Sequence, residues 1–217
     1  PDADSDQDGV LTYSEYRELL TKHPPKQEDG RPAGPISTAL PSGDLVITEF
    51  EEKNLGTMRQ WGWTIEGDAF NRDLNAGTQL MRRRAGTYHG RYLLSSYVIS
   101  DGGVGEITSP AFEIEQSHIE LMISGGDHPG RVGVNLLVDE KVVRTATGRN
   151  DDLLESVAFE VQKFRGRQAR VQIIDAHRGL WGHINVDRIY QTNRPRARRT
   201  INSIPEQLGQ LVATVHS

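Results

Sequence analysis

The fold class is indicated first by residues 118–148, which read HIELMISGGDHPGRVGVNLLVDEKVVRTATG. Its apolar segments are rich in β-branched residues and are separated by glycines or acidic residues, which is the pattern of consecutive strands. Parts of it alternate apolar with polar residues, as in a sheet that has one solvated face. The five residues VDEKV at 138–142 have the form of a tight hairpin turn.

The same pattern continues on both sides of this stretch. Segments bounded by Gly, Asp, Asn or Pro lie at 45–50, 92–99, 156–161, 169–175 and 184–190. Roughly ten strands without intervening helices predict an all-β fold, a jelly-roll-like β-sandwich over residues 44–193. The 22 glycines and 10 prolines among 217 residues fit such a turn-rich domain.

The segments that flank the sandwich differ from it in composition. Residues 24–43 hold five of the prolines and no periodic apolar pattern, so we expect a Pro-rich linker there. Residues 194–217 start with RPRARR and continue with apolar residues at helical spacing. This pattern predicts a basic linker and a short C-terminal helix, for which Ser203 and Glu206 resemble a capping box.

The composition also excludes several kinds of protein. No stretch approaches the roughly 20 apolar residues that a membrane span needs, so we expect no membrane insertion. The absence of cysteine excludes disulfides and thiolate metal sites. A net charge of -5 argues against a nucleic-acid partner, and the arginines at 194–199 are better explained as a solvated linker.

Residues 1–23 begin with a loop of the type that binds calcium. Gly9 falls at the sixth position of a twelve-residue loop, where a sharp turn requires glycine. In this register the oxygen ligands are Asp4, Asp6, Asp8, the Val10 carbonyl, Thr12 and Glu15. The loop and the short helix after it resemble half of an EF-hand without the entering helix or a second loop. We therefore expect weak calcium binding, on the order of 10⁻⁴ to 10⁻³ M; the alternative is a solvated acidic turn.

Four stretches of the sandwich together resemble a known family of modules. They are WTIEGDAF (63–70), GEITSPAFEI (105–114), residues 118–148 and ARVQIIDAHRGLWGHINVDRI (169–189). In this order they resemble the family 66 carbohydrate-binding modules that are attached to bacterial family 32 glycoside hydrolases. The resemblance implies a fructan-binding module of a larger secreted bacterial protein. We expect an extracellular, periplasmic or cell-surface location, with the signal peptide outside this chain.

The chain holds no catalytic motif that we identify. A family 32 hydrolase would need Asn-Asp-Pro, Arg-Asp-Pro and Glu-Cys motifs, whereas NRDLN at 71–75 lacks the proline and the chain has no cysteine. A serine nucleophile elbow, a phosphate loop and a His-Glu-x-x-His helix are also missing. We therefore expect a non-catalytic module; one alternative is a non-catalytic fragment of a glycoside hydrolase.

The candidate sugar-binding residues come from the stretches that carry the resemblance. A sugar needs polar groups that bridge its hydroxyls and an apolar face beside its ring. The candidates are Asp127 and His128 in a Gly-rich loop, Arg144 within a strand, Asp175 at a strand end, and Trp181 and His183 beside glycines. The structural alternatives are a turn cap for Asp127, a solvated outer face for Arg144 and core packing for Trp181.

A second calcium ion is a further expectation, from related jelly-roll modules. These modules hold an ion between the first and last strands, where this sequence has TEFEE at 48–52 and NVDRI at 185–189. The ligands would be Glu49, Glu51 and Asp187; the alternative is that these acids are salt-bridged or lie on an outer face.

The sequence thus predicts a carbohydrate-binding module for a fructan-like terminal sugar, with calcium as its cofactor. Its other partners would be the neighbouring modules of the parent protein. The alternative is a structural or interaction β-sandwich that binds no sugar.

Overall fold

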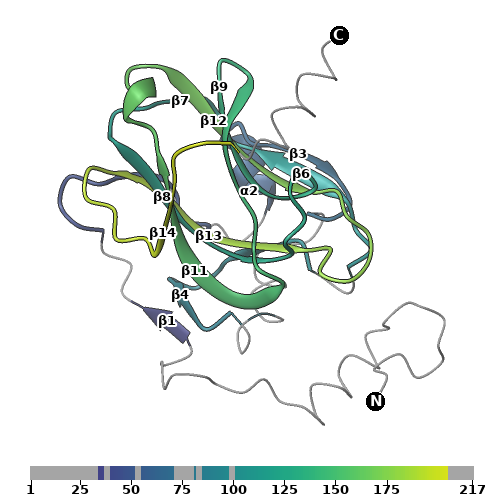
Figure 1. The fold of residues 1–217 in the computed structure, drawn as a ribbon. Helices are drawn as coiled ribbons and strands as arrows, with labels where there is room; N and C mark the ends of the chain where they lie inside the picture. The colour runs from purple at the N-terminus through teal and green to yellow at the C-terminus, as the bar shows by residue number, and fades with distance from the viewer. Residues whose placement is uncertain are drawn as a thin grey trace, which may run out of the picture.

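The computed structural model of the chain is a β-sandwich of two six-stranded sheets that pack face to face (Figure 1). It describes residues 34–36, 40–51, 55–70, 81, 85–97 and 101–204. The predicted all-β sandwich is confirmed. The predicted calcium loop at 4–15, the helix after it and the C-terminal helix lie outside the described residues.

The first sheet has the strand order β10-β9-β12-β6-β3, with β7 also paired to β12. Its strands are β3 (Thr64–Gly67), β6 (Gly105–Thr108), β7 (Phe112–Glu113), β9 (Val132–Val138), β10 (Lys141–Ala146) and β12 (Gln168–Asp175). All of these pairings are antiparallel. The predicted hairpin at 138–142 joins β9 to β10, and Asp139 and Glu140 in its turn have φ values of 49° and 60°.

The second sheet has the order β14-β11-β8-β13-β2, with β5 also paired to β13. Its strands are β2 (Leu45–Thr48), β5 (Leu94–Ser95), β8 (His118–Gly125), β11 (Asp151–Glu160), β13 (Ile184–Thr192) and β14 (Arg199–Ile201). The β11–β14 pair is parallel and the other pairs are antiparallel. Because β14 lies beyond residue 193, the sheet extends into the segment that the sequence predicted to be a linker.

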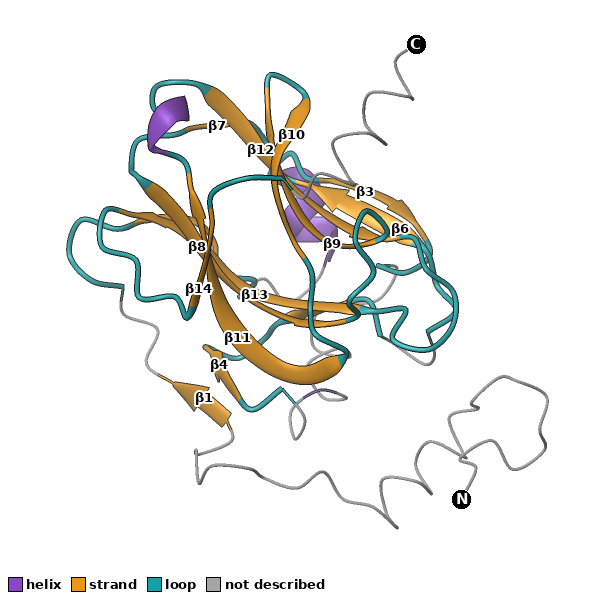
Figure 2. Cartoon of the chain, viewed as in Figure 1, coloured by secondary structure: helices purple, strands orange, loops and turns teal. Residues whose placement is uncertain are grey.

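The remaining described elements are short (Figure 2). They are β1 (Gly34–Ile36) and β4 (Thr87–His89), which pair in parallel, the helix α2 (Leu55–Gln60) and the 3₁₀ turn η1 (Gln162–Phe164). Strand β1 falls inside the segment that the sequence predicted to be a Pro-rich linker. No helix among the described residues is long and apolar enough to span a membrane.

The core lies between the two sheets, because alternate residues of the central strands point inward. In β9 the inward set includes Val134 and Leu136, and in β12 it includes Val171 and Ile173, all fully buried. Ile119, Leu121 and Ile123 of β8 face them from the other sheet. This apolar alternation is what the sequence pattern predicted.

One end of the sandwich brings together segments that are distant in the sequence. Gly125 at the end of β8 pairs with Asp151 at the start of β11 and with Ile184 at the start of β13. Asp175 at the end of β12 pairs with Val132 at the start of β9. The loops that follow or precede these strand ends therefore meet at the same end of the domain.

Candidate functional site

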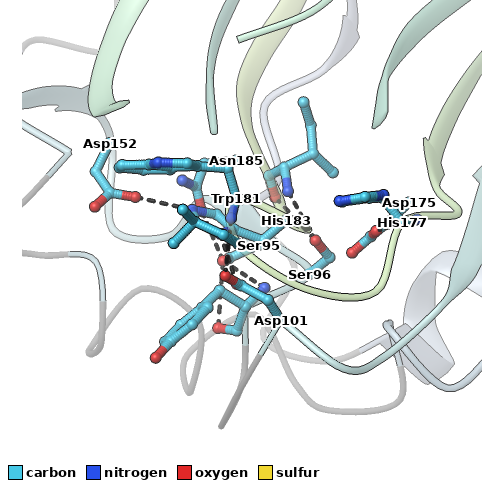
Figure 3. A network of polar contacts seen from close by, with 12 residues as sticks. Ser95, Ser96, Asp101, Asp152, Asp175, His177, Trp181, His183 and Asn185 are labelled. Carbon is cyan, nitrogen blue, oxygen red and sulfur yellow. Dashed lines mark hydrogen bonds and ion pairs between the residues drawn. The ribbon is translucent and has the colours of Figure 1, made fainter. Parts of the chain in front are cut away.

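His183 is the centre of a buried polar network at this end of the sandwich (Figure 3). Its Nδ1 lies 2.8 Å from Asp101 Oδ1, and its Nε2 lies 2.9 Å from Asp152 Oδ1. Burial alone lowers the pKa of His183, but the hydrogen bonds to both carboxylates and their negative charges raise it to about 9. The ring is therefore a cation at neutral pH, held between two acids.

Asp101 also fixes the loop that precedes β13. Its Oδ2 accepts a hydrogen bond of 3.1 Å from the Trp181 backbone N–H, and its carbonyl accepts one of 3.0 Å from Gly179. Trp181 has a φ of 60°, a left-handed conformation that a tryptophan adopts only when its surroundings impose it. The Trp181 carbonyl lies so close to Gly126 that a Cβ there would clash with it. The loop after β12 is thus tied to the loop after β8.

Asp175 is a buried carboxyl group beneath this loop and is only 1% exposed. One oxygen accepts a weak hydrogen bond from the His177 backbone N–H at 3.4 Å, while Oδ2 has no partner among the described residues. Burial raises the pKa of Asp175 to about 7. The hydrogen bonds from Ser96 and His177 act in the opposite direction but are the smaller effect. Asp175 therefore supports the loop from below and does not present its carboxylate to solvent, as a direct sugar contact would require.

The side chains above this network form what we call the loop-end surface, which consists of Asp127, His128, Arg131, His177, Leu180 and Trp181. Asp127 is exposed, and its Oδ1 accepts a 2.7 Å hydrogen bond from the Thr147 hydroxyl. Its backbone N–H is bound by Asn150 Oδ1 at 2.7 Å, so the carboxylate stands on a fixed turn.

The two histidines of the loop-end surface lie against each other. The ring centroids of His128 and His177 are 3.8 Å apart, and His128 Nε2 is 3.2 Å from the Leu180 carbonyl. Arg131 donates a hydrogen bond to His177 Nδ1. Burial lowers the pKa of His177, and the nearby His128 and Arg131 lower it further, so His177 is a neutral acceptor. Leu180 is 78% exposed beside them.

Arg144 does not belong to this site, which corrects the sequence-based expectation. Its side chain is 2% exposed, and its Nε donates to the Glu160 carbonyl at 2.8 Å while Nη2 pairs with Glu160 Oε2 at 3.3 Å. Glu160 is the last residue of β11, whereas Asp152 of the network lies near the first. The guanidinium is also 5.2 Å from the centroid of the Phe164 ring. Arg144 is therefore neither a ligand contact at the loop end nor a solvated outer-face residue.

The structure brings five of the six predicted sugar-site residues to one end of the sandwich. Asp127 and His128 lie on the loop-end surface with Trp181, while Asp175 and His183 lie beneath it. Four residues that complete the site were not among the predicted ones: Asp101, Asp152, Arg131 and His177. Arg131 and His177 lie in the quoted stretches 118–148 and 169–189. Their closeness in sequence to Asp127 and Trp181 could have identified them as members of the site.

The acids predicted to hold a second calcium ion lie at a different place, where β2 pairs with β13. Asp187 is fully buried, with Oδ2 accepting a 2.6 Å hydrogen bond from the His89 N–H. Its Oδ1 has no partner in the described part of the chain. Burial raises the pKa of Asp187 to about 8, and the negative charge of Glu51 adds to this.

The other two acids of this set differ in their contacts. Glu51 accepts hydrogen bonds from the backbone N–H groups of Arg91 and Tyr92, whereas Glu49 pairs with Arg188 at 3.0 Å. In residues 34–36, 40–51, 55–70, 81, 85–97 and 101–204, no group of three or more acids or histidines is arranged to hold a metal ion. The orphaned Asp187 oxygen beside the charge of Glu51 nevertheless fits a hard cation, which prefers carboxylate oxygen.

The strand order and the loop-end surface define the chain as a β-sandwich domain with a candidate ligand site on its loops. No known protein-family profile matches it. The chain is 30% identical over 162 residues to a putative glycosyl hydrolase, ecdE, of Aspergillus rugulosus. The matched region is 75% of this chain and 23% of that protein, so the chain spans about a quarter of its curated relative.

Two solved carbohydrate-binding modules are among the structures that resemble this chain. TmCBM61, in complex with β-1,4-galactotriose, has a TM-score of 0.39 and 15% identity, over 67% of this chain and 96% of that one. A family 35 module from an environmental isolate has a TM-score of 0.33 and 16% identity, over 53% and 84%. The β-sandwich assignment itself rests on the strand order and core described above.

Proposed function

We propose that this domain is a non-catalytic carbohydrate-binding module that holds the terminal unit of a neutral glycan at the loop-end surface. The observation that carries the proposal is the set of exposed polar side chains fixed above the buried Asp101–His183–Asp152 network. A surface whose groups are held in place loses little conformational entropy when a ligand binds.

The chemistry of the loop-end surface suits a sugar. Asp127 has one carboxylate oxygen engaged by Thr147, which leaves the other to accept a hydrogen bond from a hydroxyl. Arg131 donates one N–H to His177 and has four further N–H groups for the neighbouring hydroxyl. A donor and an acceptor on one short turn can bridge vicinal hydroxyls, and exposed Leu180 offers an apolar contact to the ring.

The class of ligand is supported by sequence. About three quarters of the chain matches part of a putative glycosyl hydrolase, and the motif stretches resemble fructan-binding modules. We infer a fructan-like terminal sugar as the more specific ligand, and an extracellular location. A terminal sugar makes few contacts, so we expect a dissociation constant of roughly 10⁻⁵ to 10⁻³ M.

Calcium is part of the same proposal. Two sites would bind it: the N-terminal loop with Asp4, Asp6, Asp8, Val10, Thr12 and Glu15, and the buried position beside Glu51 and Asp187. At the second position Glu49 is engaged by Arg188, so Glu51 and Asp187 are the residues we assign to the ion. An ion there would favour the charged form of buried Asp187 beside Glu51 and hold β2 against β13.

The alternative function is a spacer or docking domain that binds no sugar. It is favoured by one observation, namely that Asp175 and His183 are both buried and that both ring nitrogens of His183 make internal contacts. An array of neutral glycans that includes fructans, galactans and mannans separates the two functions. We expect the full chain to bind at least one of these glycans, and binding to none of them would favour the spacer.

A further inference from the structure

A groove lies on the flank of the sandwich, away from the loop-end surface. It has a volume of about 570 Å³, which is within the range of roughly 300–1,000 Å³ found for small-molecule sites. Strand β2, an edge strand of its sheet, forms one wall. The turn after α2 and the segment from Ser109 to Glu113 form the other. The groove therefore follows the open edge between the two sheets.

Trp61 is the most prominent apolar side chain of this groove. Its side chain is 58% exposed, while its backbone N–H donates to the Met58 carbonyl at 3.0 Å at the end of α2. Gly62, with a φ of 87°, turns the chain next to it and faces Pro110, whose Cγ lies 3.5 Å from the position of an added Cβ. A flat indole held on a rigid turn is a platform for the apolar face of a ring.

The groove also has a polar part that is held by internal hydrogen bonds. Gln191 is 4% exposed; its Oε1 accepts the Glu115 N–H at 2.8 Å, and its Nε2 donates to the Glu113 carbonyl at 2.9 Å. The side chains of Glu113 and Glu115 are exposed and pair with no described residue. They are therefore hydrogen-bond acceptors available at the rim.

The charge of the groove narrows the class of ligand. Its described lining includes the acids Asp44, Glu113 and Glu115 and no lysine or arginine. An anionic ligand would be repelled, whereas hydroxyl groups can donate to the carboxylates. A pyranose ring presents both a flat C–H face for the indole and hydroxyls at its edge.

We propose that this groove binds a neutral pyranose-containing saccharide chain, as a site separate from the loop-end surface. Trp61 stacks on one ring, and Glu113 and Glu115 accept hydrogen bonds from its hydroxyls. The proposal does not depend on the terminal-sugar site, because the two sites share no residue.

The test follows the indole N–H signals of the ¹⁵N-labelled full chain, which has three tryptophans. Trp61→Phe and Trp181→Phe assign the signals of the two sites. The probes are β-1,4-linked oligosaccharides of glucose, mannose and galactose, with polygalacturonate and an oligolysine peptide for comparison. We expect at least one neutral oligosaccharide to shift the Trp61 signal saturably, and polygalacturonate to leave it unchanged.

Two variants complete the test. Trp61→Ala should weaken that binding at least tenfold, whereas Trp181→Phe should leave it unchanged. If no neutral oligosaccharide moves the Trp61 signal, or if oligolysine alone moves it, the proposal is overturned. A shift of the Trp181 signal alone also overturns this proposal, while it supports the terminal-sugar site. If neither the Trp61 signal nor the Trp181 signal responds to any neutral oligosaccharide, the result counts against both sites.

Discussion

The imidazole of His183 lies between Asp101 and Asp152, at 2.8 Å and 2.9 Å from their carboxylate oxygens. Asp152 belongs to β11, His183 immediately precedes β13, and Asp101 precedes β6. One protonated ring thereby joins three segments under the loop-end surface. Asp101 also accepts a hydrogen bond from the Trp181 backbone N–H. The buried ion cluster therefore helps to fix the geometry of the loop-end surface.

The first prediction concerns pH. The pKa of His183 is about 9 in the folded chain and about 6.5 when unfolded, so its stabilising contribution is complete below pH 6.5 and lost as the pH rises through 9. Asp175 and Asp187, whose raised pKa values disfavour their charged forms, act in the same direction. Asp175 does so between about pH 4 and 7, and Asp187 between about pH 4 and 8. In denaturant unfolding, the contribution of His183 to the free energy of unfolding should fall by an amount on the order of 2 kcal/mol between pH 6.5 and 9.

The His183→Gln variant tests the source of this fall. It should lower the free energy of unfolding at pH 6 and reduce the fall between pH 6.5 and 9, most clearly between pH 8 and 9, above the pKa values of Asp175 and Asp187. His118→Gln is the matched control, because His118 contacts the hydroxyl of Ser117 and no carboxylate in the described residues. A pH profile of His183→Gln that parallels the wild type would contradict the assignment.

The second prediction concerns Arg144, which the structure places outside the sugar site. Arg144→Ala should lower the free energy of unfolding by about 2–4 kcal/mol, because it leaves Glu160 and the Val143 carbonyl without their partner. Arg144→Lys should recover part of the loss, since it keeps the charge but not the planar fork. Glycan affinity measured well below the melting temperature should be unchanged. A variant with full stability and no glycan binding would show that Arg144 contacts the ligand after all.

The third prediction concerns the N-terminal loop. Isothermal calorimetry of the full chain should detect calcium binding on the order of 10⁻⁴ to 10⁻³ M, and Glu15→Gln should remove that component because the bidentate ligand is lost. Glu28→Gln is the control, since it removes an acid outside the twelve-residue loop. Identical heats from Glu15→Gln and the wild type would rule out this loop as a calcium site.

The fourth prediction concerns the buried acids between β2 and β13. In a Glu15→Gln background, a chelator should lower the melting temperature. Adding Asp187→Asn should abolish this calcium effect and raise the melting temperature in chelator, because burial and the charge of Glu51 disfavour the Asp187 carboxylate in the folded chain. No response to the chelator in the Glu15→Gln background would mean that this calcium site does not exist.

Much of the fold could be predicted from the sequence, because apolar alternation is a local property. The hairpin at Asp139 and Glu140 and the strands from β8 to β13 follow from it. Strand β14 (Arg199–Ile201) could not be predicted, since these three residues directly follow a run of arginines and prolines and form no strand pattern of their own. It is held instead by contacts that arise on folding, which include its parallel pairing with β11 and the 2.9 Å ion pair of Arg199 with Glu155.

The site could be predicted only in part. The loops after β8 and before β13 meet because these strands are antiparallel neighbours, so Asp127 and Trp181 are brought to one end as the motifs suggested. The partners of His183 are 82 and 31 residues away in sequence, a pairing that one sequence does not reveal. Arg144 was misplaced because a register shift between Val142 and Arg144 breaks the simple alternation of faces along β10.

Sugar binding at the loop-end surface can be tested by calorimetric titration of levan, inulin and fructose into the full chain and two variants. The double variant Asp127→Ala/Arg131→Ala removes the acceptor and the donor of the loop-end surface. Glu140→Ala removes an exposed acid in the β9–β10 turn and serves as the control. We expect saturable binding at roughly 10⁻⁵ to 10⁻³ M by the wild type and the control, and at least tenfold weaker binding by the double variant. No binding of any of the three sugars, or equal binding by the double variant, would contradict this expectation.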